Sequence, residues 1–575
     1  MPKRTPEEIA QMILDNAFGD DSDIEGLSDE EDCTSVESAV PETPSEVIEI
    51  QTEENEPEPP PPKKSRQKIK KTTWKKMKFT PTAPAEDRKD SVPTEPVSPY
   101  SYFTKFITDS FIEGVCEKTN RYHFQTHGKN LRATTQEIKA LIGMHIEIGS
   151  TPFRNLRLYW SKGRRYKLIA DAMTFNRFCT LRNNFHLVDN LEENERKEDK
   201  FWKVRPIMNR VLNVLIEELP EPEKRLCVDE QMIPFKGRLA LKQYMKGKPN
   251  PWGIKVFFLC GESGMPYNFL AYQGKTTKLP EKYNQFGLSG SVVMSLVEDR
   301  VMAHSNYRLF FDNYFTSSNL VQELLTKGIY CTGTVRANRV GSLPIKPNSE
   351  LVKQGRGAMD GCTSSDNKLC LVRWNDNSLV TVLSSAYDWQ TNLGQVKRYD
   401  NSTKAYVDVA CPSAIIEYNK SMGGVDKLDF LLSLYRIHIK SKKWTLRVIF
   451  HFIDLAVVTS WLQYIKDCKS VGHPKSQQLS LLQFRFNIAE CMIKHNTNPL
   501  DKAAVGKPRR SLQSAPPTDV RFDGIGHFPV WKDKRQRCKL STCVECFSFV
   551  VCEKCGVSLC LNKQRNCFRD YHLAR

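Results

Sequence analysis

The chain lacks the long apolar runs that mark a membrane-spanning helix, because no stretch of it approaches about 18 uninterrupted apolar residues. Its first residues, Met1 to Arg4, lead into acidic sequence and not into the apolar centre of a secretory signal peptide. We therefore expect a soluble, intracellular protein with no membrane partner.

Cysteine is sparse over most of the chain. Eleven of the 18 cysteines are spread over residues 1–537, whereas seven lie in the last 38 residues. This pattern argues against a disulfide framework and favours a reducing compartment. The dense C-terminal group instead predicts a single metal-binding module.

Acidic residues are too few to balance the basic ones. The chain has 84 Lys and Arg against 67 Asp and Glu, a net charge of +17 and an isoelectric point near 9.0. Such an excess indicates a polyanionic partner, with nucleic acid as the leading candidate. At 575 residues the chain is also too long for one hydrophobic core, so about two to four domains are expected.

Large apolar side chains are rare in residues 1–97, where Glu, Asp, Ser and Pro are abundant. Such a composition cannot offset the entropy of ordering, so we expect a disordered arm. Within it an acidic block gives way to basic runs at Lys63–Lys71 and Trp74–Lys78. Runs of this kind are typical of nuclear localisation signals and also of solvated tails. We favour nuclear import and expect the protein in the nucleus.

Apolar periodicity predicts an α/β fold after this arm. Residues 98–223 carry apolar positions at helical spacing. From residue 224 to 338, short runs rich in β-branched and aromatic residues alternate with turns and predict a buried sheet. One predicted strand, Tyr307–Phe311, ends directly before Asp312, and the ends of strands are where α/β sheets place ligands. Residues 339–413 are interpreted as a separate β-rich insertion.

Three short motifs place aspartates beside apolar or glycine-rich sequence. They are VDEQ at residues 228–231, FDNY at 311–314 and GGVD at 423–426, with Asp429 three positions further on the same helix face. A single Asp after a strand is more often a turn former or helix cap. Three such motifs together predict a metal site, because paired Mg²⁺ ions about 3.5–4 Å apart bind carboxylates and promote phosphoryl displacement.

The extended motifs VDEQxxPFxGR, FDNYFTS and YNxxMGGVDxLD, in this order, closely resemble those of the piggyBac family of cut-and-paste DNA transposases. The resemblance covers about residue 98 to the C-terminus. It implies an RNase H-like catalytic core in which Asp229, Asp312 and Asp426 hold two Mg²⁺ ions, or Mn²⁺, with Asp429 as an additional acid. Many domesticated relatives have lost one or more of these acids, so their retention here favours an active enzyme.

The resemblance further implies excision through a hairpin intermediate, integration at TTAA sites, and a homodimer that binds double-stranded transposon ends and target DNA. Basic side chains near the motifs are candidates for phosphate contacts, although a lysine is more often a solvated charge. Trp444 could stack on an unpaired base, and a core tryptophan is the equal alternative. The candidate DNA contacts are Lys236, Arg238, Lys248, Lys255, Arg336, Arg339, Lys440, Lys443 and Trp444.

The expected domain organisation combines these patterns with the resemblance. Its segments are 1–97, the acidic arm with its basic segment; 98–223 and 437–505, a helical dimerisation and DNA-binding domain; 224–338 and 414–436, the catalytic core; 339–413, the insertion; 506–537, a linker; and 538–575, a cysteine-rich zinc domain.

Two-residue spacing of cysteines in the last segment is a strong zinc signal, because two such thiolates can grip one tetrahedral ion. Eight candidate ligands suffice for two structural Zn²⁺ ions in a module too small to fold on its own core. Spacing leaves their pairing open, and Cys546 is either a ligand or a free thiol. The family uses this domain to bind transposon ends, while similar density in RING and PHD domains binds proteins. The candidate zinc ligands are Cys538, Cys543, Cys546, Cys552, Cys555, Cys560, Cys567 and His572.

Two other functions remain open at this point. One is a domesticated, catalytically silent, sequence-specific DNA-binding protein that keeps the basic surface and the zinc module. The other is a chromatin adaptor whose ends recruit protein partners, which leaves the aspartate motifs unused.

Overall fold

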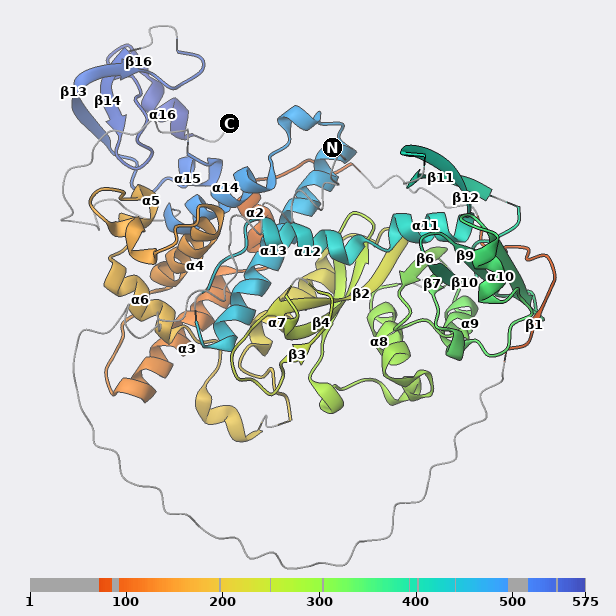
Figure 1. Ribbon diagram of the computed structural model, residues 1–575. Coiled ribbons are helices and arrows are strands. Elements are labelled where there is room, and N and C mark those ends of the chain that lie inside the picture. Colours follow the sequence, from red (N-terminus) through yellow and green to blue (C-terminus); the bar gives the residue numbers. More distant parts are fainter. Residues whose placement is uncertain are drawn as a thin grey trace, which may run out of the picture. The chain divides into compact units, whose positions relative to one another are not determined.

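The computed structural model describes part of the chain, and all its helices and strands belong to one unit that spans Arg66–Ile439 and Lys443–Arg575. Figure 1 shows a large sheet with helices on both sides. Along one side lie α11 (Ser413–Ser421) and α12 (Gly424–Leu434), and along the other lie α8 (Gly287–Glu298) and α9 (Ser318–Thr326). The described residues are 72–84, 93–195, 198–248, 250–301, 303, 305–391, 393–400, 403–439, 441–494, 516–543 and 547–573.

The predicted helical region is confirmed. Thr134 caps its helix reciprocally with Glu137, which satisfies two backbone donors at the start of α4. Its helices are α2 (Pro99–Thr104), α3 (Asp109–His127), α4 (Thr135–Ser150), η2 (Leu156–Trp160), α5 (Lys167–Ala170), α6 (Phe175–Asn184), η3 (Asn190–Glu195), α7 (Arg205–Asn213), η4 (Val214–Glu218), α13 (Trp444–Ser470), η8 (Lys475–Gln477) and α14 (Leu481–Lys494).

Helix α13 is long and apolar enough to cross a membrane, and among the described residues no other helix is. However, 89% of its most apolar window is buried inside the protein. A buried acid of this helix is paired in that interior, since Asp454 accepts a hydrogen bond from Arg485 Nη1 at 2.8 Å. Helix α13 therefore lies in the core of the helical region.

The central sheet has ten strands in the order β1-β8-β9-β10-β7-β6-β2-β4-β3, with β5 paired to β4. Strands β2, β6 and β7 are parallel to one another and the other pairs are antiparallel. The core elements are β2 (Arg225–Pro234), β3 (Gln243–Tyr244), β4 (Trp252–Gly261), β5 (Pro266–Ala271), η5 (Gly274–Thr276), η6 (Glu281–Phe286), α8 (Gly287–Glu298), β6 (Tyr307–Phe311), α9 (Ser318–Thr326), β7 (Ile329–Thr334), η7 (Ala337–Arg339), α11 (Ser413–Ser421) and α12 (Gly424–Leu434).

The insertion is strand-rich as predicted, but the prediction that it is separate is wrong for three of its strands. Strand β10 pairs with β7, so that β8 to β10 continue the central sheet. The reason is that β7 otherwise presents an unpaired edge, which β10 covers. The insertion elements are α10 (Asn348–Lys353), β8 (Met359–Ser364), β9 (Cys370–Asn375), β10 (Leu379–Ser384) and the hairpin β11 (Leu393–Asp400) with β12 (Ala405–Pro412).

The expected disorder of residues 1–97 is wrong for residues 72–84. Strand β1 (Trp74–Lys75) pairs with β8, and the side chains of Trp74 and Phe79 are buried. Trp74 Nε1 also donates to the carbonyl of Val340 at 3.0 Å. Two large aromatic side chains and a free sheet edge thus order a segment whose average composition is polar. The basic run Lys63–Lys71 lies outside the described residues.

Candidate functional site

Two of the predicted acids lie at the same level on neighbouring parallel strands. Asp229 is in β2 and Asp312 follows the last residue of β6. The register pairs Val228 with Phe311, so each aspartate is the next residue along its strand. Strand β6 ends at this point while β2 continues beside β4, so both aspartates lie where the parallel pairing stops.

The loop after β6 fixes the position of Asp312. Its Oδ1 accepts a hydrogen bond from the backbone N–H of Tyr314 at 2.9 Å, and its carbonyl accepts from Thr316 Oγ1 at 2.7 Å. Arg339 Nη1 donates to the carbonyls of Tyr314 and Thr316 at 2.8 and 3.0 Å. This candidate DNA contact is therefore engaged in supporting the loop that carries Asp312.

The remaining acids, Asp426 and Asp429, come from α12, which packs on β2 and β4. Gly424 allows this close approach, because a Cβ there would lie 2.3 Å from the carbonyl oxygen of Gly261 and 2.7 Å from Cys227 Sγ. Asp426 is in the first turn of α12 with an exposed side chain, and Asp429 is half-buried one turn later. The glycine in the GGVD motif thus brings this helix onto the strand that carries Asp229.

The electrostatics of the site are those of crowded carboxylates. The pKa of Asp229 is raised to about 7, chiefly by burial and next by the neighbouring Glu230, while Lys248 opposes the change. Burial also raises the pKa of Asp312, and that of Asp429 to about 6. Like charges gathered in this way favour binding of a cation.

Lys248 is a cation already present among these carboxylates. Its Nζ lies 4.0 Å from Asp426 Oδ1 and donates to the carbonyl of Glu230 at 3.4 Å. Burial lowers the pKa of Lys248, but Asp229 and Asp426 more than offset this effect and the pKa lies above its ordinary value. The four aspartates supply the hard oxygen ligands that Mg²⁺ prefers. Within the described residues, however, only two C-terminal sets have ligand atoms that all lie within 4.8 Å of one another, so the aspartate oxygens are gathered less closely.

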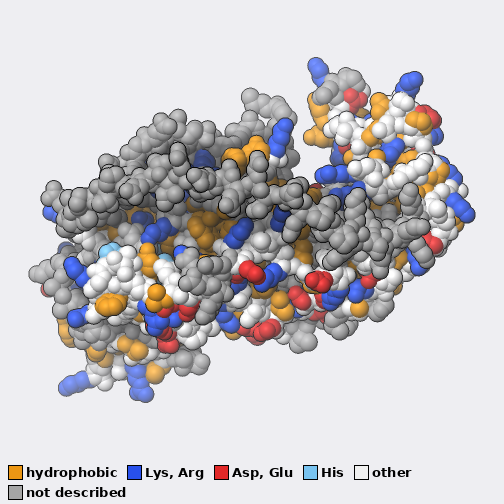
Figure 2. Space-filling view, turned by 90° about the horizontal axis from the view of Figure 1, so that it is seen from below, with side chains coloured by type: hydrophobic (Ala, Val, Ile, Leu, Met, Phe, Trp, Pro, Cys, Tyr) orange, Lys and Arg blue, Asp and Glu red, His pale blue; other side chains and the backbone are white. Residues whose placement is uncertain are grey.

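The other predicted DNA contacts differ in their surroundings. Lys236 and Arg238 are exposed, whereas Lys255 Nζ lies 3.5 Å from the carboxylate of Glu230. Arg336 Nε donates to Asn313 Oδ1 at 3.0 Å. Lys443 donates to the carbonyl of Asn183 at 2.8 Å. On the face shown in Figure 2, Lys and Arg side chains are widely spread with acidic side chains among them, so this view does not single out one DNA path.

Trp444, at the start of α13, is half-buried and meets Phe201 edge to face, with the ring centroids 6.4 Å apart. The structure is compatible with both a base-stacking tryptophan and a core tryptophan, because part of the ring is packed and part is accessible. Lys440 lies outside the described residues.

The C-terminal module contains two sets of four side chains with ligand atoms within 4.8 Å of one another. One set is Cys538, Cys543, Cys560 and Cys567, and the other is His527, Cys552, Cys555 and His572. Four thiolates, or two thiolates and two imidazoles, suit tetrahedral Zn²⁺. The module is built from α15 (Thr518–Arg521), β13 (Pro529–Arg537), β14 (Phe547–Cys552), β15 (Leu561–Asn562), β16 (Arg565–Asn566) and α16 (Cys567–His572).

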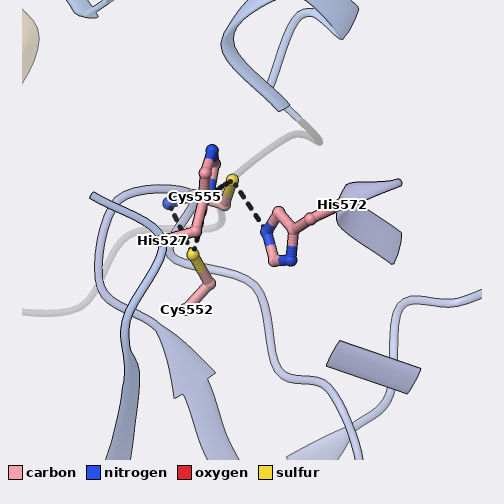
Figure 3. A group of neighbouring side chains, drawn as sticks. All are labelled: His527, Cys552, Cys555 and His572. Carbon is pink, nitrogen blue, oxygen red and sulfur yellow. Dashed lines mark hydrogen bonds between the residues drawn. The ribbon is translucent and has the colours of Figure 1, made fainter. Parts of the chain in front are cut away.

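Sequence reasoning missed His527, which precedes the cysteine run and is separated from it by β13. The structure places it beside Cys552, Cys555 and His572, as Figure 3 shows. Together with the four-cysteine set, this group is complete without Cys546, which lies outside the described residues. The sequence feature that could have revealed this ligand is a lone histidine ahead of the cysteine cluster.

Hydrogen bonds fix which nitrogen each histidine offers to a metal. His572 Nδ1 is bonded to the carbonyl of Phe568 at 2.7 Å, which leaves Nε2 facing Cys555 Sγ at 3.4 Å. His527 Nε2 is 3.0 Å from Asp523 Oδ1, and its Nδ1 is 3.4 Å from Cys552 Sγ. Asp523 is buried and also pairs with Lys554. A carboxylate behind a ligating histidine sets its tautomer and orientation.

We therefore expect Asp523→Asn to weaken zinc binding at the His527 set about 10- to 100-fold. The amide keeps the shape but loses the charge that orients His527 and balances Lys554. The measurement is competition with a chelator, followed by the metal content of the full-length protein. Asp533→Asn, at an exposed acid of β13, is the control. Equal zinc retention in the two variants contradicts this role for Asp523.

Comparison with known proteins now defines the class. A family model described as Transposase IS4 matches residues 98–461, which include all four aspartates. This match places the chain in the class of the transposases.

Two human proteins resemble the chain over most of its length. PiggyBac transposable element-derived protein 3 of Homo sapiens is 31% identical over 512 residues, which cover 87% of this chain and 81% of that protein. PiggyBac transposable element-derived protein 2 of Homo sapiens is 30% identical over 487 residues, which cover 84% and 78%. The chain belongs to the piggyBac transposase family.

A solved structure of piggyBac transposase, in a synaptic complex with hairpin DNA, has the same fold. The TM-score is 0.59 at 21% identity, and the match covers 82% of this chain and 96% of that one. The prediction of an α/β fold with an RNase H-like core is therefore confirmed.

Proposed function

We propose that the protein is a catalytically active, piggyBac-like DNA transposase that excises through a hairpin and integrates at TTAA. The observation that carries this proposal is the gathering of four intact aspartates, with Asp229 and Asp312 level on parallel strands and two more acids on α12. The family relationship supports the reaction class. A fold neighbour captured with hairpin DNA supports the hairpin intermediate.

In this proposal Asp229, Asp312 and Asp426 hold the divalent ions, with Asp429 beside them. Paired Mg²⁺ ions supply charge stabilisation and an activated oxygen nucleophile for strand cleavage and transfer. The protein contributes position: the turn after β6 holds Asp312, the packing of Gly424 holds α12, and Lys248 adds positive charge next to the phosphate that reacts.

The proposal also includes two bound zinc ions, a homodimeric state and a location in the nucleus. Two structural Zn²⁺ ions stabilise the C-terminal domain, which binds transposon ends. Two ends have to be cut and joined in one event, which favours a homodimer on double-stranded DNA. The net charge of +17 and the basic run in residues 63–71 support nuclear import and DNA binding.

A second candidate is a domesticated DNA-binding protein that no longer cuts. Two observations favour it. The carboxylate oxygens of the four aspartates do not all lie within 4.8 Å of one another, and the Lys248 ammonium group lies beside Asp426. Its DNA binding would depend on the zinc module and the basic surface alone.

Purified full-length protein and labelled DNA carrying the ends of its own element distinguish the two candidates. In Mg²⁺ the transposase is expected to nick at the transposon 3′ end. The freed 3′-OH should then attack the opposite strand, which closes the transposon end as a hairpin and releases the flanking DNA. Neither product should form in EDTA. Both species separate on a denaturing gel. Tight binding of the ends with neither product at any Mg²⁺ or Mn²⁺ concentration supports the silent protein.

Gly424→Ala tests whether close helix packing positions Asp426. The added methyl group would clash with the backbone of Gly261, and such overpacking costs about 1–3 kcal/mol. Displacement of α12 is expected to slow cleavage about 100-fold. Gly423→Ala is the matched control, because a Cβ at Gly423 meets nothing within 4 Å and its φ of −77° suits alanine. Urea unfolding and cleavage rates measure both effects, and equal behaviour of the two variants contradicts the prediction.

A further inference from the structure

The segment that joins β2 to β4, residues 235–252, has an unusual surface. It contains five Lys or Arg residues and no Asp or Glu. Within it, β3 pairs with the start of β4 so that Tyr244 lies directly opposite Trp252. The two ring centroids are 4.8 Å apart, and the residues are 56% and 45% exposed. Two large aromatic side chains that meet each other and still face solvent mark a candidate binding surface.

A backbone hydrogen bond stabilises this hairpin, and the segment that contains it extends to the aspartates of the candidate site. The backbone N–H of Met245 donates to the carbonyl of Pro251 at 2.8 Å, which closes the hairpin below the aromatic pair. Lys242 Nζ lies 4.8 Å from the centre of the Trp252 ring. Further along the same segment, Lys248 Nζ lies 4.0 Å from Asp426 Oδ1. The segment therefore joins an aromatic surface to the acids through a few residues.

We propose that Tyr244 and Trp252 are a stacking platform for unpaired DNA bases at the end being cut, with Lys242 and Lys248 beside the adjoining phosphates. This inference rests on the proposed function, in which the hairpin and its opened TTAA end carry unpaired bases. Exposed rings together with positive charge are the features by which proteins hold single-stranded DNA. Bases within a duplex are already stacked on each other and cannot use this surface in the same way.

The charge of the segment favours DNA over a protein partner. The segment carries five cationic side chains and no acid of its own, and one of the five, Lys248, lies beside the aspartates. Such a segment attracts a polyanion and repels its own copy across an interface with a second chain. Stacking on rings accepts any base, so the platform adds affinity for unpaired bases without reading their sequence.

The test compares two DNA probes that share one duplex of the element end. One probe carries a single-stranded TTAA overhang with 2-aminopurine in it, and the other is blunt. Full-length wild type, Tyr244→Leu and Trp252→Leu are titrated against both in Ca²⁺ to prevent cleavage. Each substitution is expected to weaken binding of the overhang probe about tenfold and to leave the blunt probe within about twofold. The 2-aminopurine quenching seen with wild type should be lost in both variants and restored in Trp252→Tyr.

A second exposed aromatic pair provides the matched control. Tyr399 and Tyr406 lie opposite each other on the β11–β12 hairpin, with centroids 5.5 Å apart and exposures of 49% and 70%. Leucine at either position should leave both affinities unchanged.

Three results overturn the inference: an unchanged overhang affinity in both platform variants, equal weakening on both probes, or an altered oligomeric state in size-exclusion chromatography. In Mg²⁺, a wild type that binds both probes but neither nicks nor hairpins a third duplex, in which flanking TTAA DNA adjoins the element end, overturns the proposed function alone. The affinity ratio still decides the platform. A wild type that binds neither probe overturns both.

Discussion

Asp312→Asn is expected to abolish strand cleavage while the protein keeps its fold and its affinity for transposon ends. The amide retains the shape of the side chain and can still accept the hydrogen bond from Tyr314. It removes a negative charge that a divalent ion needs, and losses of more than about 100-fold are typical when one electrostatic contribution to the reacting centre is removed. Rates of nicking and hairpin formation on labelled ends measure the effect.

Asp229→Asn is expected to behave in the same way and offers an independent check through stability. Burial raises the pKa of Asp229 to about 7, from about 3.9 in an unfolded chain. The ionised carboxylate therefore costs the metal-free wild type stability, and this cost grows as the pH rises from about 4 to 7. The variant has no such cost, so its advantage in thermal unfolding should be absent near pH 4 and largest above pH 7.

Asp299→Asn, at an exposed acid at the end of α8, is the control for both measurements. It should change neither cleavage nor the pH dependence of unfolding. Residual cleavage by Asp312→Asn within about tenfold of wild type contradicts a role for this carboxylate in metal binding.

Removal of zinc is expected to unfold the C-terminal module and leave the central sheet folded. The module buries few apolar side chains, among them Val550, Leu559 and Phe568, so metal binding has to supply most of its folding free energy. Structural zinc contributes about 10–16 kcal/mol in comparable small domains. Binding of transposon ends should fall at least about 100-fold, as measured by titration of the full-length protein after chelation or in the variant Cys560→Ser.

Cys546→Ser is the matched control for the zinc prediction. Both ligand sets are complete without Cys546, so this variant should retain two zinc ions per chain and full DNA binding. Loss of one zinc ion from Cys546→Ser, with both retained in His527→Ala, contradicts the assignment of His527 as a ligand.

Local patterns predicted the parts of the fold that depend on neighbours in sequence. The strand Tyr307–Phe311 and the position of Asp312 directly after it follow from an apolar run and a turn. The helix that carries Asp426 follows from its periodicity. These features need only information within about ten residues, which is the range over which helical and strand periodicities act.

Features that depend on long-range packing could not be predicted in this way. His527 joins Cys552 only because β13 and β14 pair. Trp74 is buried only because β8 offers a free edge nearly 300 residues later. In each case the contribution of one residue is decided by a distant partner whose position the sequence does not reveal.

Excision from a donor plasmid in cells tests the central claim most directly. Wild-type protein is paired with a donor that carries the ends of its own element, and the repaired donor site is sequenced beside that from Asp312→Asn. We predict that wild type restores an intact TTAA and that the variant leaves the element in place. If neither protein excises while both occupy the transposon ends, the chain is a silent DNA-binding relative and the enzymatic account is wrong.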